Sequence, residues 1–368
     1  MGKERGGHSQ ILCAPHQFAV DITNKCNLRC LHCYNSSGEN RIVDSEMSGE
    51  ELRALAKAIA GLGPLGCCVC GGEPLVRSEE TIGFIEGLSK SGCRINMVSN
   101  GILLNSEILH RLTNAGLTGI QFSLDGLEIS HDRLRNRKGS FSRALHAAEM
   151  VLSETDLTLS IAFCPTSFNV NDFEPLVRLL IDLYKGSGRE ERLGRSDEIS
   201  FRMQPLMLLG RARANREMRP SAEQYRRLVA TKQRLEQTLF EEHIHFDWGD
   251  PVDHLIRYRE RALPVDQVMI RANGDIIVSP YIPLVVGNVR RHELLEYWNA
   301  GLDRIWSSPL VRYLAEKLYS IGTMELMSEE VGDVNMGGDY EVDLVDDDVF
   351  DEDDSLLMRL KKEGNLEA

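Results

Sequence analysis

The chain has 368 residues, of which 42% are hydrophobic and 27% are charged, and its formal net charge is −14. This length allows one large domain with an appendage, and the apolar fraction is that of an ordinary globular protein. No run of about 18 apolar residues and no apolar N-terminal core is present, so the sequence indicates neither a membrane span nor a secretory signal.

Acidic charge is concentrated near the C-terminus. Thirteen Asp or Glu and no Lys or Arg lie between Glu329 and Asp354, so the rest of the chain sums to about −1. This distribution does not predict a nucleic-acid-binding surface.

All nine cysteines lie in the first half of the chain, which is not the pattern of a disulfide framework. We therefore expect free thiols and a cytoplasmic location.

An apolar, strand-like run over 18–23 leads into three cysteines, Cys26, Cys30 and Cys33, with the spacing C-x-x-x-C-x-x-C. Three soft thiolates on a short loop suit an iron–sulfur cluster, and a cluster of four irons would keep one iron without a protein ligand. Such an open position usually binds a substrate or cofactor. The alternatives are three buried cysteines or a zinc knuckle, for which His32 is a possible fourth ligand.

Strand and helix patterns then alternate along the chain. A capping box, Ser48 with Glu51, begins the first predicted helix. Further helices are predicted over 79–89, 106–114, 141–152 and 172–184, and strands over 67–70, 95–99, 120–124, 157–163 and 199–203. With the first strand these give six βα units, which imply a parallel sheet with right-handed crossovers and are too few for a full eight-stranded barrel.

The cysteine motif, followed by the aromatic Tyr34, resembles the signature of the radical S-adenosylmethionine (SAM) enzymes. The resemblance covers about residues 15–210 well and 211–320 more loosely. In that family the open iron of a 4Fe–4S cluster chelates the amino and carboxylate groups of SAM. An electron from the cluster splits the sulfonium into methionine and a 5′-deoxyadenosyl radical, which removes a hydrogen atom from the substrate. The family fold, a partial six-unit (β/α)6 TIM-type barrel of the α/β class, matches the count of units.

Three polar motifs stand at the predicted strand ends, where sites in such folds lie. They are Gly71-Gly72-Glu73-Pro74, about 40 residues after the cysteines, then Ser99-Asn100-Gly101 and Ser123-Leu124-Asp125-Gly126. The resemblance implies that the first motif holds the methionyl amine, that Ser123 and Asp125 bond ribose hydroxyls or the methionyl carboxylate, and that Tyr34 flanks the adenine. Arg135 is the candidate partner of the carboxylate, or else part of an exposed basic loop. The predicted cofactor-binding residues are thus Tyr34, Gly71, Gly72, Glu73, Ser99, Asn100, Ser123, Asp125 and Arg135.

Other cysteines invite a second interpretation. Cys67, Cys68 and Cys70 are predicted to be small apolar side chains of a strand buried on both faces, with a metal site as the rival. Cys164 follows the fifth predicted strand. Its thiol could donate a hydrogen atom to a substrate radical, and the alternative is an inert buried thiol.

The second half of the chain predicts a loop over 185–197, a polar helix over 220–241, a hairpin at Asn273-Gly274 and a helical stretch over 292–313 with Trp298 and Trp306. It resembles the SPASM or twitch extension of radical SAM maturases, but no cysteine follows Cys164, so we expect the frame without its clusters. The hairpin, Tyr281 and the tryptophans are expected to shape the substrate pocket, and an edge strand of the hairpin to pair with a peptide.

These patterns predict four segments: an N-terminal segment (1–15), a radical SAM partial barrel (16–210), a small α+β extension without a cluster (211–325) and an acidic tail (326–368). The tail is expected to be disordered, with a docking arm for a basic peptide as the rival. Residues 355–362 could form a short terminal helix.

The resemblance implies an enzyme with one 4Fe–4S cluster and SAM as cofactors and a flavodoxin or ferredoxin as electron donor. Its SPASM branch mostly modifies ribosomally made peptides, so a peptide is the first substrate class, by epimerisation, cross-linking or oxidation. The alternative substrate is a small molecule such as a sugar, aminoglycoside or tetrapyrrole. A third hypothesis is a non-catalytic binding partner that kept the fold. Because no auxiliary cluster is expected to relay electrons, a redox-neutral outcome is favoured.

Overall fold

The computed structural model describes residues 12–39, 41–193, 199–239, 244–249, 255–256, 265, 267–331, 339–351 and 353–364. One twisted sheet runs through this part of the chain, in the strand order β11-β10-β9-β8-β1-β2-β3-β4-β5-β6-β7. None of its described helices has the length and apolar character needed to cross a membrane.

Six parallel strands build the predicted partial barrel. They pair side by side in chain order and are β1 (Gln17–Thr23), β2 (Gly66–Gly71), β3 (Arg94–Ser99), β4 (Gly119–Ser123), β5 (Thr158–Phe163) and β6 (Ile199–Met203). The predicted α/β partial-barrel fold is confirmed.

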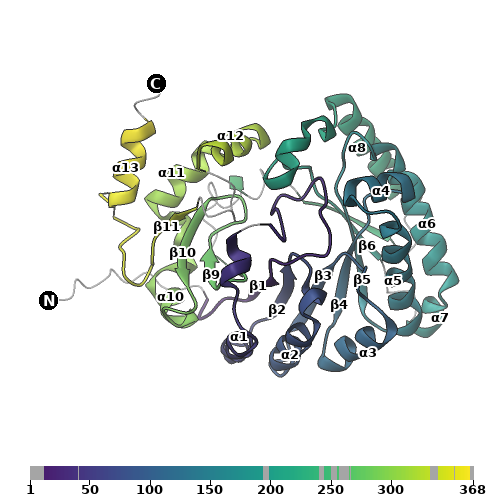
Figure 1. The fold of residues 1–368 in the computed structure, drawn as a ribbon, viewed down its shortest axis with the longest axis horizontal. Helices are drawn as coiled ribbons and strands as arrows, with labels where there is room; N and C mark the ends of the chain where they lie inside the picture. Colours follow the sequence, from purple (N-terminus) through teal and green to yellow (C-terminus); the bar gives the residue numbers. More distant parts are fainter. Residues whose placement is uncertain are drawn as a thin grey trace.

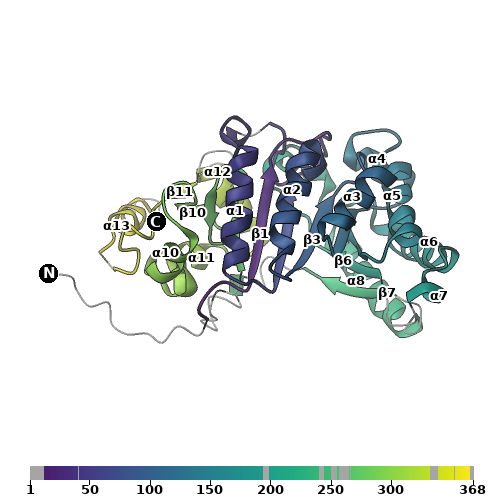
Figure 2. The same ribbon diagram turned by 90° about the horizontal axis from the view of Figure 1, so that it is seen from below.

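Helices cover the outer face of these strands, as Figures 1 and 2 show. They are α1 (Gly49–Gly61), α2 (Ser78–Ser89), α3 (Ser106–Ala115), α4 (Glu128–Arg135), α5 (Ser140–Glu154) and α6 (Phe173–Gly186). Ser48 and Glu51 form the predicted capping box of α1. Apolar side chains of alternate strand positions, such as Val20, Ile95 and Phe122, are fully buried against these helices, which leaves the other face of each strand to line the barrel interior.

Two elements differ from the sequence prediction. A short helix, α7 (Arg189–Leu193), lies within the expected loop, whose residues 194–198 are outside the described part. The fully buried Arg189 explains it, because its guanidinium donates to the carbonyls of Thr155 at 3.0 Å and Leu157 at 2.7 Å. The polar helix is α8 (Ala222–Thr238), and an unpredicted strand, β7 (Ile244–Trp248), follows and pairs in parallel with β6.

The second half of the chain extends the barrel's own sheet. β8 (Gln267–Ile270) pairs in parallel with β1, and β9 (Asp275–Ile277) forms the predicted hairpin with β8 across Asn273-Gly274. β10 (Leu284–Asn288) continues the antiparallel pairing next to β9.

The helical stretch predicted over 292–313 is divided into three helices. It consists of α10 (Leu294–Ala300), the 3-10 helix η5 (Leu302–Ser307) and the first part of α11 (Pro309–Lys317), and α12 (Ile321–Val331) follows. Gly301 ends the first of these and Pro309 begins the last, so two weak helix formers set the breaks. Trp298 and Trp306 are buried in the hydrophobic core, so they do not shape a pocket.

The acidic tail is folded wherever it is described, which corrects the prediction of disorder. β11 (Tyr340–Glu341) pairs in parallel with β10, and α13 (Ser355–Gly364) packs on α11. Apolar residues between the acidic ones provide the reason, because they are buried in the core: Val342, Leu344, Val349, Leu356, Leu357 and Leu360. The predicted terminal helix is confirmed.

The predicted hairpin offers no free edge to a peptide, because β8 pairs with β1 and β9 pairs with β10. The expected strand addition at the hairpin is therefore wrong. The tail also covers the next edge, since the amides of Tyr340, Val342 and Leu344 donate to carbonyls of residues 283–286 at 2.9–3.0 Å.

Candidate functional site

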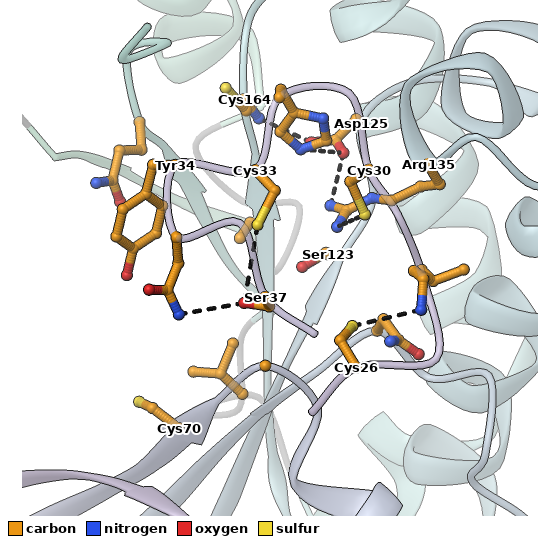
Figure 3. A pocket seen from close by; sticks show the side chains of 18 of the residues that line it. Cys26, Cys30, Cys33, Tyr34, Ser37, Cys70, Ser123, Asp125, Arg135 and Cys164 are labelled. Carbon is orange, nitrogen blue, oxygen red and sulfur yellow. Dashed lines mark hydrogen bonds and ion pairs between the residues drawn. The ribbon is translucent and has the colours of Figure 1, made fainter. Parts of the chain in front are cut away.

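A cavity of about 350 Å³ opens at the carboxyl ends of the barrel strands. The cysteine loop forms one wall, and the ends of β2, β3, β4 and β5 form the others (Figure 3). The structure brings together here every residue predicted for the site except Glu73, namely Cys26, Cys30, Cys33, Tyr34, Gly71, Gly72, Ser99, Asn100, Ser123, Asp125, Arg135 and Cys164.

The cysteine loop is held by backbone contacts with distant elements. The amide of Leu31 donates to the carbonyl of Leu134 at the end of α4 (2.8 Å), and the amide of Arg211 donates to the carbonyl of Cys33 (3.0 Å). Arg211 belongs to the 3-10 helix η4 (Gly210–Met218), and its Nε donates to the carbonyl of Cys30 at 3.0 Å. At Gly210 an added Cβ would lie 2.4 Å from the carbonyl oxygen of Tyr34. Only glycine allows this approach.

The three thiols of the loop have different neighbours. Cys26 Sγ accepts from the amide of Leu28 at 3.4 Å, Cys30 Sγ lies 3.7 Å from Arg135 Nη1, and Cys33 Sγ lies 3.8 Å from the hydroxyl of Ser37. Burial raises the pKa of Cys26 to about 12 and also raises that of Cys30. Three soft sulfur donors on one cavity wall, with a guanidinium beside them to offset thiolate charge, fit an iron–sulfur cluster.

The glycine pair at the end of β2 permits close contact with the cysteine loop. An added Cβ at Gly72 would lie 2.4 Å from the carbonyl oxygen of Lys25, and one at Gly71 would lie 2.2 Å from that of Thr23. The amide of Gly72 donates to the Thr23 carbonyl at 2.7 Å, and that of Glu73 donates to the Lys25 carbonyl at 3.0 Å. The motif therefore fixes the start of the cysteine loop against β2.

Glu73 does not line the cavity, contrary to the expectation that its carboxylate faces the site. Only 1% of the residue is exposed. The carboxylate accepts hydrogen bonds from the amide of Asn100 at 2.7 Å, the hydroxyl of Ser99 at 2.9 Å and the amide of Leu75 at 3.1 Å. Burial raises its pKa, although these donors oppose the shift. The carboxylate thus ties the end of β3 to the turn after β2.

Asp125 is the centre of a buried charged group. Its carboxylate lies 2.6 Å from Arg135 Nη2 and 3.3 Å from His32 Nε2, and it accepts from the amide of Cys164 at 3.0 Å. Burial alone would raise the pKa of Asp125, but the charges of Arg135 and His32 hold it well below its usual range. The Asp125 amide donates to Nδ1 of His131, whose pKa burial lowers to about 3. Asp125 therefore fixes other groups and carries no free carboxylate.

Several buried polar atoms beside the cavity have no hydrogen-bond partner among the described residues. They include Arg135 Nε, His32 Nδ1 and Asn27 Nδ2. Because buried polar groups are nearly always paired, these atoms suit a polar ligand that the protein alone does not supply.

The other predicted residues take separate places on the wall. Tyr34 is 42% exposed, and Asn100 donates from Nδ2 to the side-chain oxygen of Asn27 at 2.7 Å. Ser123 ends β4 and is labelled in Figure 3. Burial raises the pKa of the Cys164 thiol, so the thiol stays protonated.

Sequence reasoning missed several lining residues. Asp21 and Cys70 face the cavity from β1 and β2, Gln204 follows β6, and Arg211 reaches back from η4. The rule that sites lie at strand ends could have found Gln204, and a charged residue inside an apolar strand could have flagged Asp21. Nothing in the sequence placed Arg211 beside the cysteines.

The extension contributes less than expected. None of its described residues beyond Arg211 lines the cavity. Tyr281 approaches it indirectly, because its hydroxyl accepts from Gln204 Nε2 at 3.2 Å. Among the described residues the cavity is thus a product of the barrel.

Comparison with known proteins finds a family match for the part of the chain that carries the site. Residues 20–180 match the model of the radical SAM superfamily. The chain is similar to an Fe-coproporphyrin III synthase of Methanosarcina barkeri, with 30% identity over 44% of this chain and 39% of that protein. It is also similar to the sporulation killing factor maturation protein SkfB of Bacillus subtilis, with 29% identity over 44% of this chain and 39% of SkfB. The matched region spans less than half of each relative.

Among solved structures, the fold resembles that of Streptococcus suis SuiB bound to the precursor peptide SuiA. The TM-score is 0.60 at 16% identity, over 78% of this chain and 65% of that chain. This likeness supports the partial-barrel fold.

Proposed function

Since residues 20–180 of this chain match the model of the radical SAM superfamily, we propose that the protein belongs to it, holds one 4Fe–4S cluster on Cys26, Cys30 and Cys33 and uses the cluster to cleave SAM. The observation that carries the proposal is the convergence of these thiols with the strand-end residues in one cavity. When bound, the cluster supplies the electron that splits SAM into methionine and a 5′-deoxyadenosyl radical, which takes a hydrogen atom from the substrate.

The residues around the cluster position have separable tasks in this proposal. Arg135 is held by Asp125 and offers its unpartnered Nε–H to the SAM carboxylate. The backbone of Gly71 and Gly72 lies beside the cysteine loop and receives the methionyl amine. Glu73 acts behind them, by holding Ser99 and Asn100 in place.

The adenosine half of SAM meets the remaining wall. The exposed ring of Tyr34 offers a flat surface to the adenine, and the Ser123 hydroxyl can bond the ribose. Asp125 contributes to this part only through its partners, because its oxygens are already engaged.

For the substrate we infer a ribosomally made peptide. The names of two similar proteins support this class: SkfB is a maturation protein, and the SuiB structure contains a precursor peptide. The region 211–325 serves as an extension without a cluster, since no cysteine follows Cys164. A flavodoxin or ferredoxin in a reducing cytoplasm then delivers the electron.

A small molecule is the second candidate substrate. One similar protein is named for an iron coproporphyrin, and a cavity of about 350 Å³ lies within the range of small-ligand sites, about 300–1,000 Å³. A precursor peptide encoded beside the gene should raise the rate of SAM cleavage if the first candidate is right. A rise with a coproporphyrin alone would favour the second.

The proposal is tested by SAM cleavage in anaerobically reconstituted, dithionite-reduced protein. Chromatography should detect 5′-deoxyadenosine and methionine in equal amounts. The triple variant Cys26→Ala, Cys30→Ala, Cys33→Ala should form neither. Cys13→Ala is the matched control, because Cys13 is exposed and lies outside the cavity, and it should behave as wild type. Cleavage by the triple variant would overturn the assignment.

A further inference from the structure

The three cysteines of β2 do not form one group. Cys67 is 3% exposed and packs in the hydrophobic core with the helices, as predicted. Cys68 and Cys70 point to the other face of the strand and are partly exposed, which differs from the predicted burial on both faces. Their sulfur atoms are 3.1 Å apart.

This sulfur pair belongs to the wall of the cavity. Cys70 lines the cavity, and the strand register sets Asp21 of β1 beside it. In Figure 3, Cys164 lies near the top of the view and Cys70 near the bottom. Cys68 lies one pleat behind Cys70, away from the mouth. Any molecule in the cavity would therefore meet Cys70 first, with Cys68 as its immediate neighbour.

The contact shifts the pKa values of the two thiols in opposite directions. A hydrogen bond from Cys70 and the charge of Arg202 hold the pKa of the Cys68 thiol below its usual value. The same contact and burial hold the pKa of Cys70 well above its usual value. These directions favour the proton on Cys70, the sulfur that faces the cavity, and negative charge on Cys68.

We propose that Cys68 and Cys70 are a redox-active dithiol, in which the Cys70 thiol donates a hydrogen atom to a carbon radical in the cavity. This inference rests on the proposed radical SAM function. The Cys70 S–H bond breaks and a C–H bond forms on the radical. The sulfur radical left on Cys70 then bonds to the Cys68 thiolate as a disulfide radical anion.

The cycle closes with reagents of known class. The disulfide radical anion gives one electron to an oxidised flavodoxin or ferredoxin and becomes a neutral disulfide. An external dithiol then returns two electrons and two protons, which restores both thiols, and the Cys68 thiol releases one proton to the solvent to return to the thiolate. The substrate keeps its oxidation state, because it loses one hydrogen atom to the 5′-deoxyadenosyl radical and gains one from Cys70.

Strand geometry strains the disulfide, which makes it easier to reduce. Residues two apart on a strand have Cα atoms about 6.6 Å apart, near the upper end of the range of about 4.4–6.8 Å that a disulfide spans. Cys164 also lines the cavity, but within the described chain its sulfur contacts no second sulfur. A radical on Cys164 would therefore lack this route.

The first test maps thiols and needs no turnover. Trypsin releases residues 58–77 as one peptide, which carries Cys67, Cys68 and Cys70 and none of the other cysteines. After the full-length protein is treated with oxidised glutathione, this peptide should lose two alkylation sites and weigh less by two hydrogen atoms. The change should reverse with a dithiol and be absent in Cys68→Ser and in Cys70→Ser. Three free thiols in the oxidised wild-type peptide would overturn the proposal.

The second test uses SAM itself as the source of the carbon radical. Reduced, cluster-loaded protein without substrate should form 5′-deoxyadenosine that carries deuterium in D2O, because thiol hydrogens exchange with the solvent. The deuterium content per molecule formed should fall to less than half in Cys70→Ser and stay unchanged in Cys13→Ser. An unchanged content in Cys70→Ser, whether or not Cys164→Ser lowers it, would overturn the proposal.

The two tests also separate this inference from the function on which it rests. Wild-type protein that forms no 5′-deoxyadenosine would contradict the radical SAM function. Wild-type protein that forms it without deuterium would contradict only the dithiol.

Discussion

At the scale of single residues, three acidic side chains near the site have different roles because their surroundings differ. Glu73 is buried among neutral donors, Asp125 is paired with Arg135, and Asp21 is half-buried on β1, where the charge of Arg271 favours its ionised form. Each environment predicts a different response to mutation or pH.

Glu73→Ala should destabilise the fold, because it removes the acceptor of three buried donors. We expect the free energy of unfolding to fall by about 2–4 kcal/mol, measured by urea denaturation. Glu79→Ala is the matched control. Glu79 lies in the next helix, is exposed and pairs with Arg111 at the surface, so its removal should leave the unfolding midpoint nearly unchanged. Full stability of Glu73→Ala with lost SAM binding would instead assign Glu73 to the cofactor.

Asp21 should make stability depend on pH. Burial raises its pKa from 3.8 to about 6. Because the folded-state pKa is raised, the stabilising contribution is present below about pH 4 and is lost as pH rises through 6. The free energy of unfolding of Asp21→Asn should therefore exceed that of wild type by on the order of 1–2 kcal/mol at pH 7.5, after allowance for the partial exposure of Asp21. At pH 4.5 the difference should be much smaller. Urea denaturation of both proteins at the two pH values measures this difference in unfolding free energy. A difference that does not change with pH would contradict the role of Asp21.

At the scale of elements, alternation of strands and helices was readable because apolar residues recur with clear periods, as in Leu52, Leu55 and Ile59 of α1. The site motifs could also be predicted, because the periodicity locates the strand ends and strand ends surround the site in such folds. The buried setting of Glu73 was not, because it depends on donors 26 and 27 residues away. The prediction of a disordered tail was wrong because it rested on net charge and gave no weight to apolar residues that are buried, such as Leu344 and Leu357.

The docking of the tail depends on a buried ion pair. Arg271 after β8 meets Asp339 with Nη1–Oδ2 at 2.6 Å and Nη2–Oδ1 at 3.1 Å, and both side chains are almost fully buried. Removal of one partner of such a pair costs about 3–5 kcal/mol, because the other charge stays buried and unpaired.

Asp339→Asn should therefore loosen β11. We expect faster hydrogen exchange at the amides of Tyr340, Val342 and Leu344, with unchanged exchange in β1 to β6, measured by mass spectrometry. Glu341→Gln is the control, because Glu341 is exposed within the same strand. Equal exchange in Asp339→Asn and wild type would show that apolar burial alone holds the tail.

At the scale of the whole molecule, the barrel and the extension form one continuous sheet, with β8 paired to β1. The cavity lies in the barrel part, and the extension and tail cover one edge of the sheet. This arrangement predicts that one cluster, held by the three loop cysteines, serves the whole chain.

Anaerobic iron and sulfide analysis of reconstituted protein tests this claim most directly. We predict about four irons and four sulfides per chain, as one cubane cluster requires. The triple variant Cys26→Ala, Cys30→Ala, Cys33→Ala should bind almost none, whereas the triple variant Cys67→Ser, Cys68→Ser, Cys70→Ser should keep about four of each. About eight irons in wild type, or a loss of iron in the second variant, would contradict the claim.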